Sequence, residues 1–132
     1  MTLVESIVNY YTTGATAEAT ALRAILPIMA ADILWSNPTP PYCLVEDKVS
    51  DVEYEPIGKA RRIDKVVITF SVYAATRASA SAIMSAIENT YLRNYLTEAM
   101  AKPTLMDRAT KREKDYFVGT LNFNFYVEKN PQ

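Results

Sequence analysis

The stretch of sequence that decides the fold is Ile63-Asp-Lys-Val-Val-Ile-Thr-Phe-Ser-Val-Tyr73. Apolar residues fill its even positions from Val66 to Val72, while the odd positions from Val67 to Tyr73 are more polar. This period of two is the pattern of a strand that turns one face to a core. β-branched residues, which suit a pleated surface, fill much of the segment. The sequence therefore predicts a strand over residues 63–73.

A second strand with the same alternation is predicted at residues 116–128. Its two faces would carry Phe117, Leu121, Phe123, Phe125 and Val127 on one side and Tyr116, Thr120, Asn122, Asn124 and Tyr126 on the other. Such alternation is typical of an antiparallel sheet with one buried face. Residues 42–49 predict a third strand, with Cys43, Val45 and Val49 on a shared face, and residues 104–110 a weaker fourth. The tail at 129–132 should fray.

Three helices are predicted around these strands. Residues 3–11 form the first, ended by Gly14 in a left-handed conformation. Thr16 caps the second, which breaks near Pro27. Thr76 caps the third, over residues 77–97. The apolar stripe of this third helix is Ala80, Ile83, Met84, Ile87, Tyr91 and Tyr95.

The order of these elements predicts the fold class α+β, with a four-stranded, mainly antiparallel sheet and helices packed on one face. The chain has 132 residues, which fits one domain over residues 1–132. We expect a helical N-terminal part at 1–35 and the sheet with its one long helix at 36–128. A proline-rich connector at 35–41 joins the two parts and should be extended.

The composition argues against catalysis. The chain has no histidine and a single cysteine, Cys43, so the usual general base and the commonest metal ligand are both missing. Cys43 shares the apolar face of a predicted strand, which favours a packed core thiol. Only three glycines occur, and they do not cluster in a phosphate-binding loop. We therefore expect no enzyme activity, no cofactor and no metal.

Charge and hydropathy also restrict the location and the partners. The formal net charge of −1 gives no overall attraction to DNA or to anionic membranes. The longest apolar stretch, residues 24–34, is too short to span a bilayer, and the first residues do not resemble a signal peptide. We expect a protein of the cytosol or a component of a particle.

Residues 46–65 form the most charged segment, and residues 46–60 are predicted to be a long hairpin loop. The acidic residues come first and the basic residues follow, in the order Glu46, Asp47, Asp51, Glu53, Glu55, Lys59, Arg61, Arg62 and Lys65. A second basic stretch lies at 108–114. The charges are either a solvated surface or an interface in which the acidic stretch of one subunit meets a basic stretch of the next. DNA contact is a lesser alternative.

Several of these features together resemble a known family. They are the entry into a strand at Pro40-Pro41-Tyr42, the turn Val72-Tyr73-Ala74-Ala75, a helix with regularly placed alanines, and the aromatic alternation Leu121-Asn-Phe-Asn-Phe-Tyr126. Over residues 20–128 the chain resembles the tail terminator and tail-completion proteins of tailed bacteriophages and related prophage elements.

The resemblance implies a non-enzymatic virion protein of the neck or tail, assembled in the bacterial cytoplasm. It implies that copies of the chain form a ring, commonly a hexamer, that terminates the tail tube and joins it to the head connector. The implied partners are further copies of the chain, the tail tube protein and the head–tail connector protein, with DNA near the ring lumen and no membrane. Two alternatives remain open, namely a head-completion or adaptor protein of the same particle and a ferredoxin-like, ligand-binding regulatory dimer.

Overall fold

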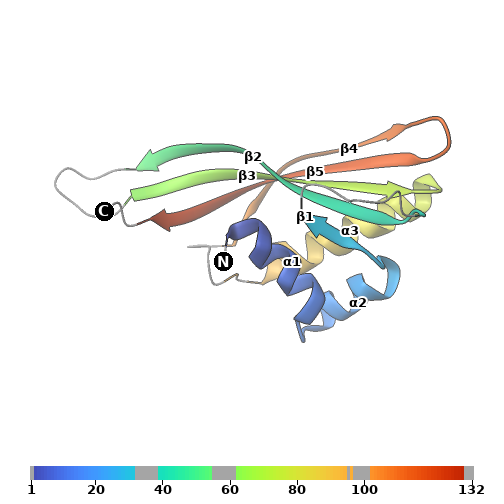
Figure 1. Cartoon of the computed structure of the whole chain (residues 1–132), viewed down its shortest axis with the longest axis horizontal. Helices are drawn as coiled ribbons and strands as arrows, with labels where there is room; N and C mark the ends of the chain where they lie inside the picture. The colour runs from blue at the N-terminus through green and yellow to red at the C-terminus, as the bar shows by residue number, and fades with distance from the viewer. Residues whose placement is uncertain (1, 32–38, 55–61, 95, 97–101, 130–132) are drawn as a thin grey trace.

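The computed structural model describes residues 2–31, 39–54, 62–94, 96 and 102–129. Its elements are α1 (Leu3–Thr13), α2 (Ala17–Ile25), β1 (Met29–Ala31), β2 (Tyr42–Tyr54), β3 (Arg62–Ala74), α3 (Arg77–Arg93), β4 (Thr104–Arg112) and β5 (Phe117–Lys129). The strands form one sheet in the order β1-β2-β3-β5-β4. The three helices lie on the same side of this sheet (Figure 1). The predicted α+β class is confirmed.

The prediction of four strands is wrong, because a fifth strand, β1, pairs parallel with β2. Pro27 does end the second helix, since α2 stops at Ile25. The chain then extends beside Cys43, whose backbone N–H donates a 2.9 Å hydrogen bond to the carbonyl oxygen of Ile28. The predicted helical part at 1–35 therefore also contains a sheet strand. Three residues are too few to show a period of two, so the sequence pattern does not reveal this strand.

The predicted strand at 42–49 is confirmed as part of β2, but the strand continues to Tyr54, so the predicted hairpin loop at 46–60 is wrong as far as residue 54. Its remaining residues, 55–60, lie outside the described residues. β2, β3 and β5 are each 13 residues long. The end of β2, the start of β3 and the end of β5 extend beyond the helices and form an arm (Figure 1). The charges at 46–54 did not prevent a strand, because this stretch lies at an edge of the described sheet, where charged residues are common.

A register shift inside β2 changes which of its residues share a face. Asp47 pairs with Ile68 but Val49 pairs with Val67, so one extra residue is inserted at Lys48. Such a bulge reverses the alternation on either side of it. Cys43 and Val45 are both buried, as predicted, while Val49, the third residue of the expected common face, comes after this register shift.

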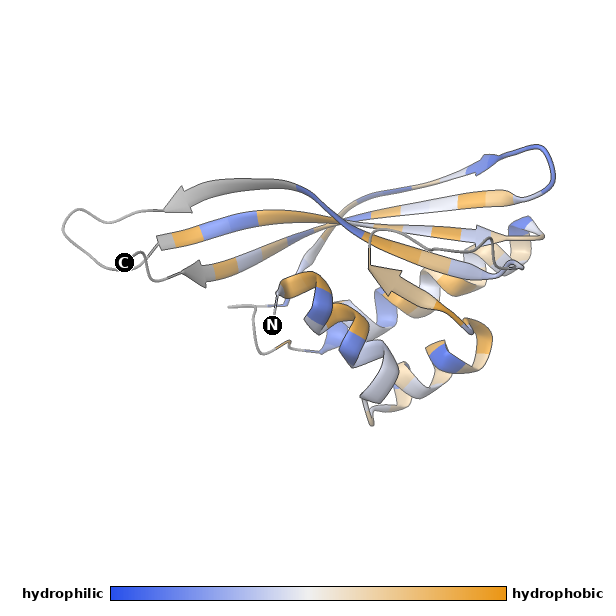
Figure 2. Cartoon of the chain, viewed as in Figure 1, coloured by the Kyte–Doolittle hydropathy of each residue, from blue (hydrophilic) through white to orange (hydrophobic). Residues whose placement is uncertain are grey.

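The core lies between the sheet and the helices. The even residues of β3 from Val66 to Val72, and Leu121, Phe123 and Phe125 of β5, are buried as predicted. Figure 2 shows the alternation of apolar and polar residues along these two strands. The buried residues of α3 are Ala80, Ile83, Met84, Ile87, Thr90 and Tyr91. Tyr95, predicted to belong to the same stripe, lies outside the described residues.

Threonine caps begin all three helices. The side chains of Thr2, Thr16 and Thr76 accept hydrogen bonds from backbone N–H groups three residues later, as predicted for Thr16 and Thr76. The predicted left-handed Gly14 is wrong, since its φ is −59°. A glycine is nevertheless required there, because a Cβ would lie 2.5 Å from the carbonyl oxygen of Tyr10. The third helix ends at Arg93, before the predicted residue 97.

Candidate assembly surface

No described element covers the face of the sheet opposite the helices (Figure 1), and this face carries an aromatic cluster. Tyr42 and Tyr73 are directly opposite each other on β2 and β3, and their rings stack at 4.6 Å between centroids. The ring of Tyr116, from the β4–β5 turn, lies 5.7 Å from that of Tyr73. Burial raises the pKa of both Tyr42 and Tyr73, so their phenols stay neutral. The cluster therefore offers apolar ring surface with hydroxyl groups, as protein interfaces often do.

A chain of polar side chains joins three strands on the same face. The hydroxyl of Thr69 on β3 donates to Asn122 Oδ1 on β5 at 2.5 Å. Asn122 Nδ2 in turn donates to Asp107 Oδ1 on β4 at 2.7 Å. Each member thus has a partner, so the chain stabilises the strand register and is not arranged for proton transfer.

The two edges of the sheet carry opposite charge. β1 pairs only with Cys43–Val45, so in the described part of the chain β2 has no outer neighbour from Glu46 onward. That stretch of β2, residues 46–54, contains four acidic residues and one lysine. At the other edge, β4 contains Arg108, Lys111 and Arg112 with a single acidic residue, Asp107.

The predicted site residues lie in three places: on β2, on β3, and in the segment 55–61 between them, which is outside the described residues. Glu46 lies on β2 and pairs with Lys48 at 3.1 Å, and Asp47 beside it is exposed. Asp51 is directly opposite Lys65 in the register of β2 and β3. Glu53 lies at a register shift of β2, and Arg62 is opposite Lys129 of β5. The last three predicted residues, Glu55, Lys59 and Arg61, lie outside the described residues.

This placement changes the expected pairing of charges. Lys65, a basic residue of the segment, is opposite the acidic Asp51 in the strand register of the same chain. The second basic stretch, expected at a turn, instead lies mostly on the edge strand β4. Its strand pattern was weak because β4 is largely exposed on both faces. The basic group that lies on an edge strand is therefore the one on β4.

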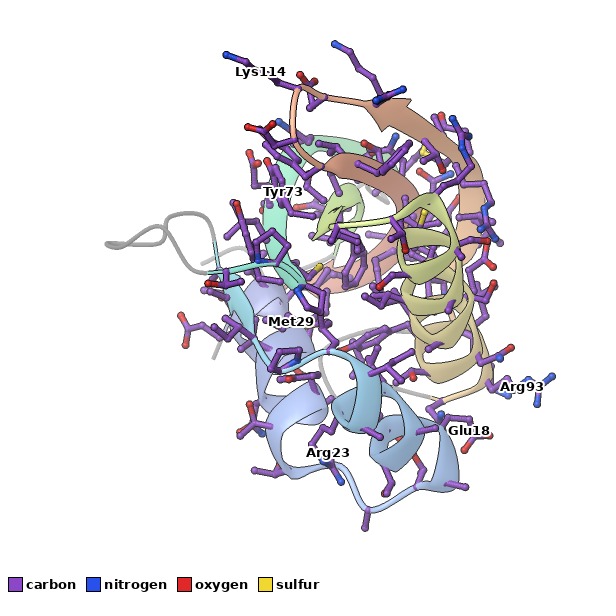
Figure 3. The ribbon with its side chains drawn as sticks, turned by 90° about the vertical axis from the view of Figure 1, so that its right-hand side faces the viewer. Glu18, Arg23, Met29, Tyr73, Arg93 and Lys114 are labelled. Atoms are coloured by element: carbon purple, nitrogen blue, oxygen red, sulfur yellow. The ribbon has the colours of Figure 1, made fainter. Side chains whose placement is uncertain are left out.

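The basic residues of this edge differ in whether they form ion pairs within the chain and in how exposed they are. Arg108 Nη1 donates to Glu88 Oε2 of α3 at 2.9 Å. Lys111 forms an ion pair with Glu113 at 3.4 Å, and 78% of its side chain is exposed. Arg112 and Lys114 are also exposed, and Lys114 points outward from the β4–β5 turn, away from α1 and α2 (Figure 3). Arg108 thus stabilises the fold, while the other three cations face solvent.

The described residues contain no group of three metal-ligating side chains. Cys43 is fully buried, and this burial raises the pKa of its thiol far above the ordinary value, so the reactive thiolate does not form near neutral pH. The described part of the chain has no helix both long and apolar enough to cross a membrane.

Comparison with known proteins gives matches in structure only. No family model matches the sequence, and no curated protein matches it. The fold is shared with two proteins of known structure. One is a chain from the virion of a native gene transfer agent particle, with a TM-score of 0.61, 19% identity and coverage of 98% of this chain and 100% of that chain. Another is the gp17 protein of bacteriophage SPP1, with a TM-score of 0.55, 16% identity and coverage of 97% and 89%.

Proposed function

We propose that this chain is a structural protein of the neck or tail of a phage-type particle, where it forms a ring that terminates the tail tube and joins it to the head connector. One observation carries the proposal: the whole fold matches a chain of a gene transfer agent virion from end to end. The match to a bacteriophage protein of similar length supports the same class of particle.

The candidate surface is suited to binding proteins rather than to chemistry. It combines a tyrosine cluster, a sheet face that no described element covers and two sheet edges of opposite charge. Opposite charges on two different surfaces favour head-to-tail contact between identical subunits, and contacts of that kind close into a ring when the rotation between neighbouring copies allows it. The proposed contacts are with copies of the chain in a ring, commonly a hexamer, and with the tail tube and head connector proteins.

The charged segment from Glu46 to Lys65 is the proposed site of subunit or tube contact. Its described part lies on the arm, which extends beyond the helices (Figure 1). A projecting arm can reach a neighbouring subunit without disturbing the core, because its contacts are made outside the helical layer. An assembly role for this segment therefore agrees with its position in the fold.

Fractionation of particle intermediates tests this proposal. Cells that produce the particle are lysed, and headless tails are separated from tailless heads on a density gradient. A terminator should be recovered with the tails at a fixed stoichiometry, as measured by mass spectrometry. Recovery with the heads would instead identify a head-completion or adaptor protein, and absence from both fractions and from whole particles would contradict a structural role.

A further inference from the structure

We infer that subunits associate by pairing the acidic edge of β2 in one copy with the basic edge of β4 in the next, so that the sheet continues across the subunit boundary. This inference rests on the proposed ring and specifies its contact. In the proposed function the charged segment from Glu46 to Lys65 makes the contact. Here its acidic part on β2 pairs with a basic partner that lies outside that segment, on β4.

The directions of the strands allow this pairing between copies in the same orientation. β2 is antiparallel to β3, β3 to β5, and β5 to β4, so β2 and β4 run in opposite directions within one sheet. β4 lies level with Tyr42–Val49 of β2 in its own sheet, so a second copy in the same orientation must also be shifted along the strands to bring its Glu46–Tyr54 stretch beside β4 as an antiparallel partner. Head-to-tail contacts of this kind use two different surfaces and close into a ring when the rotation between copies allows it.

The two edge stretches also have the same length, and both have backbone N–H and C=O groups without a strand partner on the outer side in the described structure. β4 has nine residues, and the part of β2 beyond its pairing with β1 also has nine, from Glu46 to Tyr54. Within these stretches the register is regular over Val49–Val52 of β2 and over Asp107–Arg112 of β4. Unpaired N–H and C=O groups along an edge strand are a template for another strand.

The net charges of the two edges favour pairing of β2 with β4 over pairing of like edges. The 46–54 stretch of β2 has a net charge of −3 and β4 a net charge of +2. Two copies of the same edge would repel each other, whereas the unlike edges attract. Charges on an edge strand commonly prevent pairing, but here they prevent only the pairing of like edges. The second copy is therefore favoured over an unrelated partner, because it supplies the complementary edge at equal concentration.

Charge exchange between the edges tests the inference. The first variant, Lys111→Glu with Arg112→Glu, makes the β4 edge acidic and leaves the Arg108–Glu88 pair intact. The second, Asp47→Lys with Glu53→Lys, makes the β2 edge basic and keeps Asp51 opposite Lys65. The third combines all four changes. Ser81→Glu with Ser85→Glu, on exposed positions of α3, is the matched control.

The oligomeric state is measured by native mass spectrometry and analytical ultracentrifugation at low salt, with a melting curve for each variant. Each two-residue variant should associate at least about tenfold more weakly than the wild type while melting normally. The four-residue variant should recover association, since its edges are again unlike. An equimolar mixture of the two two-residue variants should also assemble, because each edge then finds an unlike partner.

Amide hydrogen exchange separates strand pairing from a merely electrostatic contact. In the wild-type oligomer, exchange in residues 104–112 should slow relative to the dissociated protein, because outward N–H groups of β4 become hydrogen-bonded. Normal association of both two-residue variants, or unchanged exchange in β4, would overturn the inference and leave the proposed ring standing. A wild-type chain that stays monomeric at the highest soluble concentration would also overturn the inference.

Discussion

Arg108 on β4 donates a 2.9 Å hydrogen bond to Glu88 on α3, twenty residues away in the sequence. The contact connects the basic edge of the sheet to the longest helix of the described structure, on the face opposite the tyrosine cluster. It therefore assigns Arg108 to the fold and leaves Lys111 and Arg112 for contact with another molecule.

The first prediction concerns this pair. Glu88→Gln removes the charge but keeps a hydrogen-bond acceptor, so it should lower the free energy of unfolding by less than about 1 kcal/mol, as for other surface pairs. Subunit association should stay within about twofold of the wild type, because the edge cations Lys111 and Arg112 are untouched. Denaturant titration and ultracentrifugation measure the two effects. A large loss of association with normal stability would show that Arg108 belongs to the interface.

The second prediction concerns Tyr91, which connects the helices to each other. Its buried hydroxyl donates to the carbonyl oxygen of Ile7 at 2.6 Å, joining α3 to α1. Tyr91→Phe should lower the free energy of unfolding by about 1–2 kcal/mol, because the Ile7 carbonyl loses a partner in a dry site. Tyr10→Phe is the control, since the Tyr10–Thr16 contact is only partly buried and should matter less. Equal effects of the two changes in urea unfolding would refute this assignment.

The third prediction tests whether β5 is a core strand. Phe123 is fully buried and meets Phe70 edge-to-face at 5.4 Å between ring centroids. Phe123→Ala should lower the free energy of unfolding by about 3–5 kcal/mol. Met106→Ala on the neighbouring strand, where the side chain is exposed, should cost far less. A melting temperature shifted by only a degree or two in the Phe123 variant would contradict the burial.

Close packing of α3 on β5 gives the fourth prediction. A Cβ at Gly119 would lie 2.3 Å from the sulfur of Met84. Gly119→Ala should therefore lower stability by about 1–3 kcal/mol through overpacking. Met84→Ala leaves a cavity, so combining the two changes should cost less than the sum of the single effects. If the losses in the free energy of unfolding are strictly additive in a double-mutant cycle, Gly119 of β5 and Met84 of α3 are not in close contact.

The fifth prediction follows from the buried thiol of Cys43. Burial raises the pKa of this thiol, so the folded state keeps the proton at a pH where the unfolded chain releases it. The thiol contribution to stability is thus present below the unfolded pKa, about 8.5, and is lost as pH rises above it. Between about pH 8.5 and pH 10 the wild type should lose stability more steeply than Cys43→Ala. Parallel pH profiles, or rapid labelling of the native thiol, would contradict this.

Periodicity predicted the parts of the fold in which one face is buried. The even residues of β3 and the odd residues of β5 meet the helical layer, so a period of two is imposed on their sequence. β1 escaped prediction because it is three residues long and follows a helix directly. The extension of β2 beyond Val49 was not predicted, because this stretch is held as a strand by its pairing with β3 and its own residues show no run of apolar alternation.

The candidate surface could be predicted only in part. The segregation of acidic and basic residues is visible in the sequence, but the sequence does not show that Asp51 lies opposite Lys65. Nor does it show that β4 is an edge strand, since strand order depends on tertiary pairing. The basic partner of the acidic stretch therefore became identifiable only when both edges of the sheet were known.

The length distribution of tails tests the central claim most directly. The gene for this chain is deleted in cells that produce the particle, and tails are measured by electron microscopy with and without the wild-type gene supplied in trans. If the chain terminates the tail tube, the deletion should give headless tails of irregular, excessive length, and the supplied gene should restore one length and joined heads. Headless or joined tails of normal length in the deletion would contradict the claim.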